Sequence, residues 1–592
     1  MLKPLKRKAS YANLSMTSFL KKNIPILDKY KHEVIWQSIK FFRDANLNKW
    51  AIDVYNGIPN GITFSAYEKR CIDFSYFSSR LAILDEKLPS DLLDYLHKER
   101  ENILDGETVE CLPWLISLYN IKRSYPNSDF SDTGLGYYAK VFESIIPSED
   151  YKRHKDIIFG DSEASKKELK ISLKKLLKTR SISDFYYDNY TALMISSRMI
   201  QDSFLKQNIE SVLLLMMVKS DYSILFAEED GSEFSSFKVN YDDLNFIDSI
   251  YSDEKKVAQN LSKKNNEISW FAVSEEDVFQ LILNEGDFTF HSLDKWDWKR
   301  FKELEKNSYF SELQFDDTIK DHNGVRQISN EEYLEASLDI LKRVQFSDIK
   351  TTPSSKNLFV IKDMKLASFP HNLLLSNNEF IHSKKGIANI LSTEWYSSVK
   401  DQTYLNQDFS KSIWIPTEKG DFTLNHLFGS LEEQLSNQSF TIYQNSDLEK
   451  PINSDLNIIC SHGSSEIAKK QVFYSSSQSP HEPGKIIGEG EILVFFVCHS
   501  GSYSKEYLRN NINSIVKSAI IEGYKAVIAP FWSLHVNIPK IWLSSFIESM
   551  NQGNQIVKSV FEANSAVAKK FPTPSAWAAM HLYGNPHLRT PS

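Results

Sequence analysis

The chain has 592 residues, of which 41% are hydrophobic and 25% are charged, and its formal net charge is −8. This composition predicts roughly two to four folded domains and excludes a chain that is disordered throughout. The acidic balance argues against a protein whose main task is to neutralise nucleic-acid phosphates. The longest clean apolar runs, Val212–Val218 and Ile492–Cys498, have seven residues each, whereas a membrane span needs about 20.

The cysteines of the chain are Cys71, Cys111, Cys460 and Cys498. They are too few and too scattered for a disulfide framework or a zinc ribbon, so a reducing, cytoplasmic compartment is expected. We expect neither a metal ion nor a cofactor. Any chemistry carried by cysteine must then come from one of these thiols acting singly.

The first part of the chain is predicted to be helical. Residues 1–25 contain no acidic residue and several lysines, which predicts a basic flexible tail. Over residues 26–207, apolar residues recur three and four apart in stretches such as His32–Asn46 and Leu88–Asn102, as in amphipathic helices. We expect a recognition or regulatory region here. Its lysine-rich segment Lys166–Lys178 fits a core helix with a solvated face better than a helix that binds membranes or nucleic acid.

Residues 208–350 have a different pattern of apolar and charged residues. Apolar runs between Val212 and Asn240, on either side of a turn at Asp230–Gly231, suggest strands. The stretch Asp253–Gln345 is highly charged, rich in Trp and Phe, and carries few strand signals. We therefore predict that this stretch is helical and connects two domains.

Residues 351–592 read as an alternating α/β domain. Short apolar runs predict strands at Leu358–Ile361, Leu456–Cys460, Ile492–Val497, Ala526–Pro530 and Trp577–Tyr583. Helical spacing over Lys505–Glu522, closed by Gly523, and a second stretch beginning near Pro539 predict helices between them. Apolar strands that alternate with helices predict a mostly parallel sheet covered by helices on both faces.

Two of these strands end in residues that can carry chemistry. Leu456–Cys460 runs into His462 and Gly463, and Ile492–Val497 runs into Cys498, 36 residues after His462. Functional groups of parallel sheets lie just beyond the carboxyl ends of the strands, so the imidazole and the thiol are expected to face each other. Such an imidazole lowers the effective pKa of the thiol and can protonate a leaving amine. The N–H groups of Gly463 and Cys498 could form an oxyanion hole.

A cysteine at the end of a strand is more often only a packed core residue, which is the interpretation preferred for Cys460. Motifs in a fixed order support a more specific interpretation for the domain as a whole. They are Leu366–Leu374 (LASFPHNLL), Ile459–Gly463 (ICSHG), Phe496–Gly501 (FVCHSG), Ile521–Trp532, Asn551–Gly553, and Ser575–Ala579 with Gly584–Pro586. This order resembles that of the CHAT domain, a caspase-like and separase-like cysteine peptidase domain of clan CD.

The resemblance implies an α/β caspase-like fold for residues 351–592, with His462 as general base and Cys498 as nucleophile. A candidate inactive caspase-like half with connecting helices would occupy residues 208–350, preceded by the helical region at 26–207. Together these assignments predict a mainly α-helical N-terminal part followed by a caspase-like domain.

The substrate pocket is not fixed by these motifs. Asp363 and Glu466 are candidates, because a carboxylate in the pocket would select a Lys or Arg side chain, and His499 is a candidate because it could line the cleft. For Asp363 and Glu466 a solvated surface position is the commoner alternative, and a histidine such as His499 is more often a hydrogen-bonded structural residue.

The function expected from the resemblance is a caspase-like thiol protease that cleaves a partner protein. Its N-terminal region would regulate it, by analogy in a prokaryotic antiviral defence or regulated-death pathway. One alternative is a non-catalytic scaffold that keeps the domain for protein interactions. A second is binding of nucleic acid by the helical half, which the net charge of −8 makes the weakest of the three.

Overall fold

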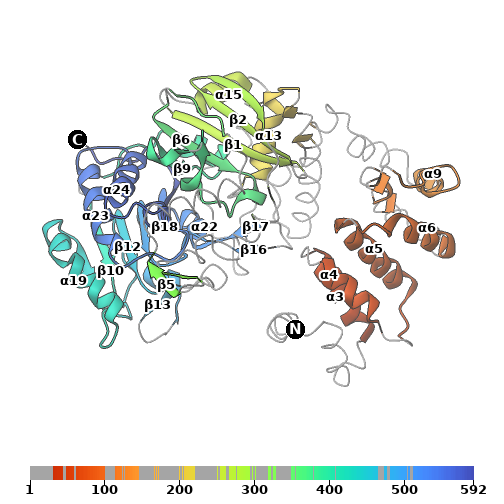
Figure 1. Cartoon of the computed structure of the whole chain (residues 1–592), viewed down its shortest axis with the longest axis horizontal. Coiled ribbons are helices and arrows are strands. Elements are labelled where there is room, and N and C mark those ends of the chain that lie inside the picture. The colour runs from red at the N-terminus through yellow and green to blue at the C-terminus, as the bar shows by residue number, and fades with distance from the viewer. Residues whose placement is uncertain are drawn as a thin grey trace. The chain divides into compact units, whose positions relative to one another are not determined.

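The computed structural model describes the chain between residues 31 and 591 with gaps (Figure 1). Outside the described residues lie 1–30, 45–47, 59–61, 84, 101–113, 116, 120, 123–124, 126, 146–165, 167–168, 170, 172–198, 201–202, 205, 221–249, 251–253, 262–265, 275–276, 294–296, 298–300, 302–317, 322–323, 328–348, 354, 378, 407–408, 464–472, 476–479, 503, 507–510 and 592. The chain divides into two compact units, Met1–Ala164 with Glu506–Asn510, and Ser165–Lys505 with Asn511–Ser592. The domain limits predicted at residues 25, 207 and 350 stay predictions.

The first unit is helical in its described residues. Its helices are α3 (Lys31–Asp44), α4 (Asn48–Asn56), α5 (Ala66–Ala82), α6 (Leu88–Lys98) and α9 (Leu135–Ile145). A capping box starts α5, in which Ser65 and Glu68 bind each other's backbone N–H groups. The helices predicted at His32–Asn46 and Leu88–Asn102 correspond to α3 and α6. The predicted basic tail lies outside the described residues, as does most of Lys166–Lys178.

A buried carboxylate ties three of these helices together. Asp73 of α5 accepts hydrogen bonds from the hydroxyls of Tyr55 in α4 (2.8 Å) and Tyr95 in α6 (2.6 Å). The ammonium group of Lys69 lies 2.8 Å from the same carboxylate. Buried polar groups are tolerated only when they are paired, so this network fixes how α4 and α6 pack on α5.

The region between residues 208 and 350 differs from the prediction in two ways. The apolar run Val212–Val218 is helical, within α13 (Ile209–Lys219), because Asn208 caps the helix by accepting from the Ser211 N–H. A short apolar run that is buried on all sides has no periodicity to separate helix from strand. The runs predicted after Ser220, up to Asn240, lie outside the described residues.

The stretch predicted to be helical also contains strands. It supplies the meander β1 (Asn266–Ser274), β2 (Asp277–Asn284) and β3 (Asp287–Ser292), after the helix α15 (Glu254–Leu261). Aromatic and β-branched residues of β1 and β2 are buried, and these outweigh the high charge of the stretch as a whole. The turn between β2 and β3 has positive φ at both Glu285 and Gly286, the geometry of a tight hairpin.

One sheet of eleven strands forms the core of the second unit (Figure 1). Its order is β11-β10-β12-β15-β18-β19-β9-β6-β1-β2-β3. The strands not yet introduced are β6 (Asn357–Lys362), β9 (Gly386–Asn389), β10 (Lys411–Trp414), β11 (Thr441–Tyr443), β12 (Leu456–Cys460), β15 (Ile492–Phe496), β18 (Ala526–Pro530) and β19 (Met580–Gly584). Most neighbouring pairs are parallel, which confirms the predicted α/β class.

Nine of the eleven strands form two parallel blocks that run in opposite directions, and β2 and β3 extend the sheet with antiparallel pairs. Strands β11, β10, β12, β15 and β18 are parallel to one another, and so are β19, β9, β6 and β1. The two blocks meet at the antiparallel pair β18–β19, where Pro530 faces Met580. The carboxyl ends of the first block therefore lie at the same edge of the sheet as the amino ends of the second.

Helices flank this sheet. They include α18 (Thr393–Val399), α19 (Phe422–Asn437), α22 (Ile515–Ile521), α23 (Ile538–Asn551), α24 (Ile556–Lys570) and α25 (Pro574–Trp577). Helix α19 packs on α23, which packs on α24. The helix expected over Lys505–Glu522 is shorter than predicted because Ser514 caps it, but Gly523 ends it with φ of +113° as expected. The strand expected at Trp577–Tyr583 begins later, because Pro574 opens a short helix first.

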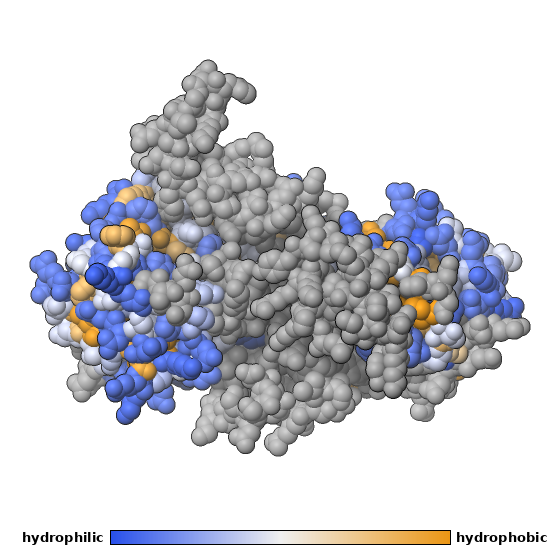
Figure 2. Space-filling model, turned by 90° about the horizontal axis from the view of Figure 1, so that it is seen from below, coloured by the Kyte–Doolittle hydropathy of each residue, from blue (hydrophilic) through white to orange (hydrophobic). Residues whose placement is uncertain are grey.

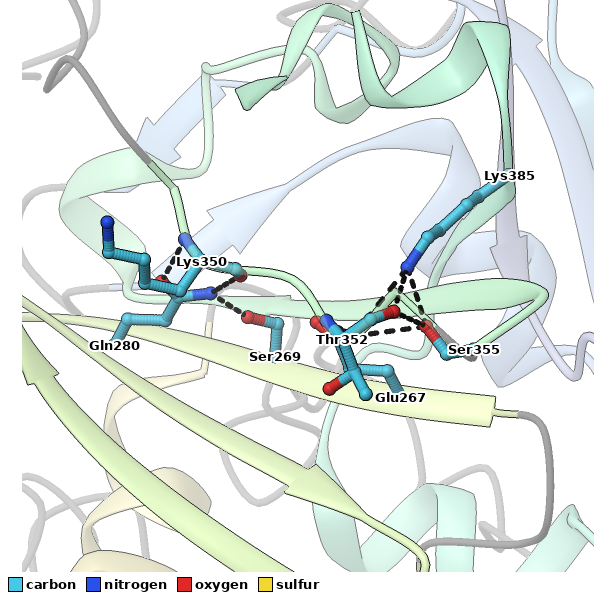
Figure 3. Close-up of polar contacts among 7 residues, drawn as sticks. All are labelled: Glu267, Ser269, Gln280, Lys350, Thr352, Ser355 and Lys385. Atoms are coloured by element: carbon cyan, nitrogen blue, oxygen red, sulfur yellow. Dashed lines mark hydrogen bonds and ion pairs between the residues drawn. The ribbon is translucent and has the colours of Figure 1, made fainter. Parts of the chain in front are cut away.

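A buried polar network fastens the segment before β6 to β1 and β2 (Figure 3). The Glu267 carboxylate accepts from the Thr352 N–H (2.6 Å) and the Ser355 hydroxyl (3.1 Å). The Lys385 ammonium group donates to Ser355 (2.7 Å) and lies 3.9 Å from the Glu267 carboxylate. Burial raises the pKa of Glu267 and lowers that of Lys385, so each charge depends on the other for compensation.

We predict that Lys385→Met destabilises the protein by about 3 kcal/mol at pH 8, because it leaves the buried Glu267 carboxylate without a cation. The folded-state pKa of Glu267 is raised, so the folded chain binds this proton more readily than the unfolded chain, and the loss shrinks as pH falls toward 5. Urea unfolding at both pH values measures it. The double variant Glu267→Gln/Lys385→Met serves as control and recovers most of the stability. A loss that is equal at both pH values contradicts the prediction.

Candidate active site

The two motifs that carry His462 and Cys498 end on neighbouring parallel strands. Strands β12 and β15 pair in register from Leu456 opposite Ile492 to Cys460 opposite Phe496. His462 and Cys498 each follow two residues after the last of these pairs. The structure therefore places both residues at one edge of the sheet and at the same height along it.

An approach between backbones brings the motifs still closer together. An ideal Cβ atom on Gly463 would lie 2.1 Å from the carbonyl oxygen of Cys498 and 2.9 Å from its nitrogen. Cβ atoms essentially never come this close to other atoms, so the observed packing requires glycine at position 463. The backbone of the histidine motif is thus packed directly on the backbone of the cysteine motif.

The imidazole of His462 is held by a carboxylate. Its Nε2 atom lies 2.8 Å from Oδ2 of Asp421, whose side chain is only 3% exposed, whereas the His462 side chain is 40% exposed. The backbone of His462 pairs with Tyr474 through two hydrogen bonds of 3.0 and 3.3 Å. Because an ionised carboxylate only accepts hydrogen bonds, Nε2 carries the proton and Nδ1 is left as the basic atom.

Asp421 is the site residue that sequence reasoning missed. It is the N-cap of α19, and its other oxygen accepts from the Leu424 N–H at 2.9 Å. The sequence does show a helix start here, an Asp after Gly420 and before an amphipathic stretch. Its contact with His462 joins residues 41 positions apart, and nothing in the local pattern indicates that pairing.

Cys498 lies in a turn that is fastened to the end of β18. The N–H of His499 donates to the Trp532 carbonyl (3.2 Å), and the N–H of Gly501 donates to the Pro530 carbonyl (2.8 Å). His499 has φ of +62°, a left-handed conformation that costs energy for any residue with a side chain. The surrounding bonds hold this strained turn, so the position of the Cys498 thiol is well defined.

The thiol itself is partly buried and receives a backbone hydrogen bond. The Leu534 N–H donates to its sulfur at 3.4 Å. Burial raises the pKa of Cys498, while the N–H groups of Leu534 and of Cys498 itself oppose this rise. The expectation of a lowered pKa is not met in this structure, because burial outweighs these hydrogen bonds.

Buried aromatic and histidine rings pack next to the turn that contains Cys498. His581 of β19 packs edge-on against Trp532 and His371, with ring centroids 5.6 and 4.7 Å apart. The Tyr583 hydroxyl donates to the Gly501 carbonyl at 3.4 Å. Burial lowers the pKa of His581 to about 3, so this histidine is neutral near pH 7 and acts as a packing residue.

The other candidate residues are not all brought to this edge. Asp363 follows β6, which belongs to the block of opposite direction, so it lies at the other edge of the sheet. It is fully buried, not solvated, and lies 3.3 Å from the Lys219 ammonium group. His499 lies at the same edge as His462 and Cys498, but it is buried, with Nε2 3.2 Å from the Ser533 hydroxyl. Burial lowers the pKa of this histidine. Glu466 lies outside the described residues.

Cys460 is buried within β12, and burial raises its pKa strongly. Cys71, Cys460 and Cys498 form no disulfide among the described residues. Among the described residues, no group of three His, Cys, Asp or Glu side chains is arranged to hold a metal ion. None of the helices in the described part of the chain is long and apolar enough to span a membrane.

No protein-family model matches the sequence, and no curated protein matches it either. Two crystal structures of the Saccharomyces cerevisiae separase–securin complex are similar to the chain, each with a TM-score of 0.41. Sequence identity is 11% and 12%, over 98% and 94% of this chain and 54% and 53% of the other. The chain thus spans about half the length of the solved chains that it matches.

We predict that Gly463→Ala destabilises the protein by about 1–3 kcal/mol, because the added methyl group forces the two motif backbones apart. It also changes the rate at which iodoacetamide alkylates Cys498. Thermal unfolding and mass spectrometry of the alkylated chain measure the two effects. Gly429→Ala is the matched control, since a Cβ there meets nothing within 4 Å and alanine favours the interior of α19. Equal stability of the two variants contradicts the prediction.

Proposed function

We propose that the chain is a caspase-like cysteine endopeptidase of the CHAT type, which cleaves a peptide bond in a partner protein. The observation that carries the proposal is the placement of His462 and Cys498 at the ends of paired parallel strands, with Gly463 packed on Cys498. An imidazole, a thiol and flanking backbone N–H groups at one sheet edge are the set that acyl transfer requires.

The arrangement of His462 suits a general base. With Nε2 donating to Asp421, the lone pair of Nδ1 is available to take the Cys498 proton. Asp421 then acts as a positioning residue, because it fixes the tautomer and stabilises the imidazolium ion that forms. The burial of its carboxylate strengthens this interaction, since water competes for it less.

The reaction follows from these roles. As the thiol proton passes to His462, the sulfur attacks the carbonyl carbon, and the oxyanion that forms is stabilised by the N–H groups of Gly463 and Cys498. The imidazolium ion then protonates the leaving amine, the C–N bond breaks, and a thioester remains. Water, deprotonated by His462, hydrolyses the thioester and restores the thiol.

The raised pKa of Cys498 bears on how the nucleophile is formed. A thiol that is neutral at rest is deprotonated by the base only when a substrate is in place, instead of waiting as a thiolate. A thiol with a raised pKa reacts more slowly with small oxidants and electrophiles, because its thiolate fraction is smaller. This fits a peptidase whose activity is restrained before its target binds.

The helical N-terminal unit is proposed as the part that recognises a regulator or the target protein. Its described helices form their own cores, one around α3, α4 and the start of α5 and another around α6 and α9, so it has the build of a separate module. The role in prokaryotic defence or regulated death rests on the sequence resemblance alone and stays a prediction, as does a cytoplasmic location.

We predict that Cys498→Ala abolishes cleavage of a protein target while Cys460→Ala retains it. Only the first variant removes the nucleophile, and the second loses a packed core thiol. The measurement is appearance of new N-termini, by mass spectrometry, in a cell extract mixed with the purified full-length chain. Equal cleavage by wild type and Cys498→Ala would contradict the assignment of Cys498 as nucleophile. Retained partner binding without cleavage by either chain would favour the scaffold alternative.

We predict that Asp421→Asn lowers the cleavage rate by about a hundredfold or more, because an amide lets the imidazole adopt the wrong tautomer. The helix α19 stays intact, since asparagine caps helices as well as aspartate does. Cleavage rates and thermal unfolding, measured on the same preparation, separate the two effects. An unchanged rate contradicts the positioning role, and a collapse of stability would assign Asp421 to the fold alone.

A further inference from the structure

The residue after Asp421 in the chain is an aromatic residue whose side chain is not packed in the fold. Phe422, the first residue of α19, is 88% exposed and is the most exposed of the large apolar residues that the structure describes. The others are Ile83, Ile171 and Tyr404. Figure 2 shows a face whose described residues are mostly hydrophilic, with only small and separate hydrophobic patches. An isolated exposed apolar residue is ordinary by itself, so its position decides whether it matters.

The position of Phe422 is set by Asp421. These two residues are consecutive, and the carboxylate of Asp421 lies 2.8 Å from the His462 imidazole. Cα atoms of consecutive residues are about 3.8 Å apart, so the Phe422 backbone is fixed within one residue of the group that holds the base. While the Asp421 side chain points inward, the Phe422 ring lies in solvent.

The helical geometry turns Phe422 away from the core. The buried stripe of α19 consists of Leu424, Leu427, Leu431 and Leu435. At about 100° per residue, Phe422 lies about 200° from Leu424 and thus on the opposite face. On that same face, one turn further along, His426 lies 3.5 Å from the Asn537 side chain.

The contact between His426 and Asn537 joins this face of α19 to the segment that bonds Cys498. Asn537 ends the segment 533–537, which also contains Leu534, the residue whose N–H bonds the Cys498 sulfur. Leu534 and Val536 are partly exposed apolar side chains of this segment. Phe422 is therefore next in the chain to the residue that holds the base, and Leu534 and Val536 belong to the segment whose backbone bonds the thiol.

We propose that Phe422 is a specificity-determining residue that docks an apolar side chain of the substrate polypeptide close to the scissile bond. The inference rests on the proposed peptidase function and names the chemistry of one substrate position. Both segments adjoin the proposed site, so we expect an extended peptide bound there to reach them. An apolar side chain that covers the ring of Phe422 removes its surface from water. A residue that folding does not need is thereby given a use in binding.

The test compares the wild-type chain with Phe422→Ser, with Phe422→Leu as the conservative variant and Ile83→Ser as the control for losing an exposed apolar side chain. A peptide library made by cutting a whole-cell proteome after glutamate is the probe. Cleavage positions are read by mass spectrometry, and the apolar preference at each position around the cut is tabulated. Retention of the same peptides by the four chains in a Cys498→Ala background measures docking without catalysis.

The expected result is an apolar preference at one position that falls about tenfold in Phe422→Ser, that is by about 1.4 kcal/mol, and survives in Phe422→Leu and Ile83→Ser. An unchanged preference in Phe422→Ser overturns the inference and leaves the peptidase function intact. If no chain cleaves, the peptidase proposal fails, and retention then decides the docking role: tenfold weaker retention by Phe422→Ser supports it, and equal retention overturns it. A dimer that dissociates in Phe422→Ser, with the preference unchanged, assigns the ring to a second copy of the chain.

Discussion

The contact between the Gly463 and Cys498 backbones is the constraint on which the site depends. It requires that β12 and β15 be neighbours, that they run in parallel, and that they end at the same height. It also requires a residue without a Cβ atom, since even a methyl group would overlap the Cys498 carbonyl. The sheet order, with β15 between β12 and β18, supplies the remaining supports, because β18 ends in the residues that hold the cysteine turn.

Two layers of support give the site different properties on its two sides. On the thiol side, a strained turn is held by the end of β18 and packs against buried rings, among them His581, whose pKa burial lowers to about 3. On the base side, the His462 imidazole is more exposed and is oriented through one carboxylate. The reactive atoms are thus placed by packing on one side and by electrostatics on the other.

Much of the site could be predicted because its signals are local. The strands Leu456–Cys460 and Ala526–Pro530 were expected with their observed bounds, since continuous apolar runs between helical stretches are typical of buried parallel strands. Placement of His462 and Cys498 followed from the rule that strand ends carry functional groups. Two predictions failed because the local signals are ambiguous. Val212–Val218 has no periodicity that separates helix from strand, and charged neighbours obscure the strands of the β1–β3 meander.

The remaining errors concern long-range arrangement. The reversal of direction at β18–β19 sends Asp363 to the far edge of the sheet, and no local pattern records which way a strand runs. The contact between Asp421 and His462 likewise depends on the long-range arrangement of the chain. It also couples the capping of α19 to the orientation of His462. Since one carboxylate both caps α19 and orients His462, fraying of the first turn of this helix releases the imidazole. In the proposed peptidase, activity then depends on the local opening of this turn, and we expect heating to lower it at temperatures where the sheet is still folded.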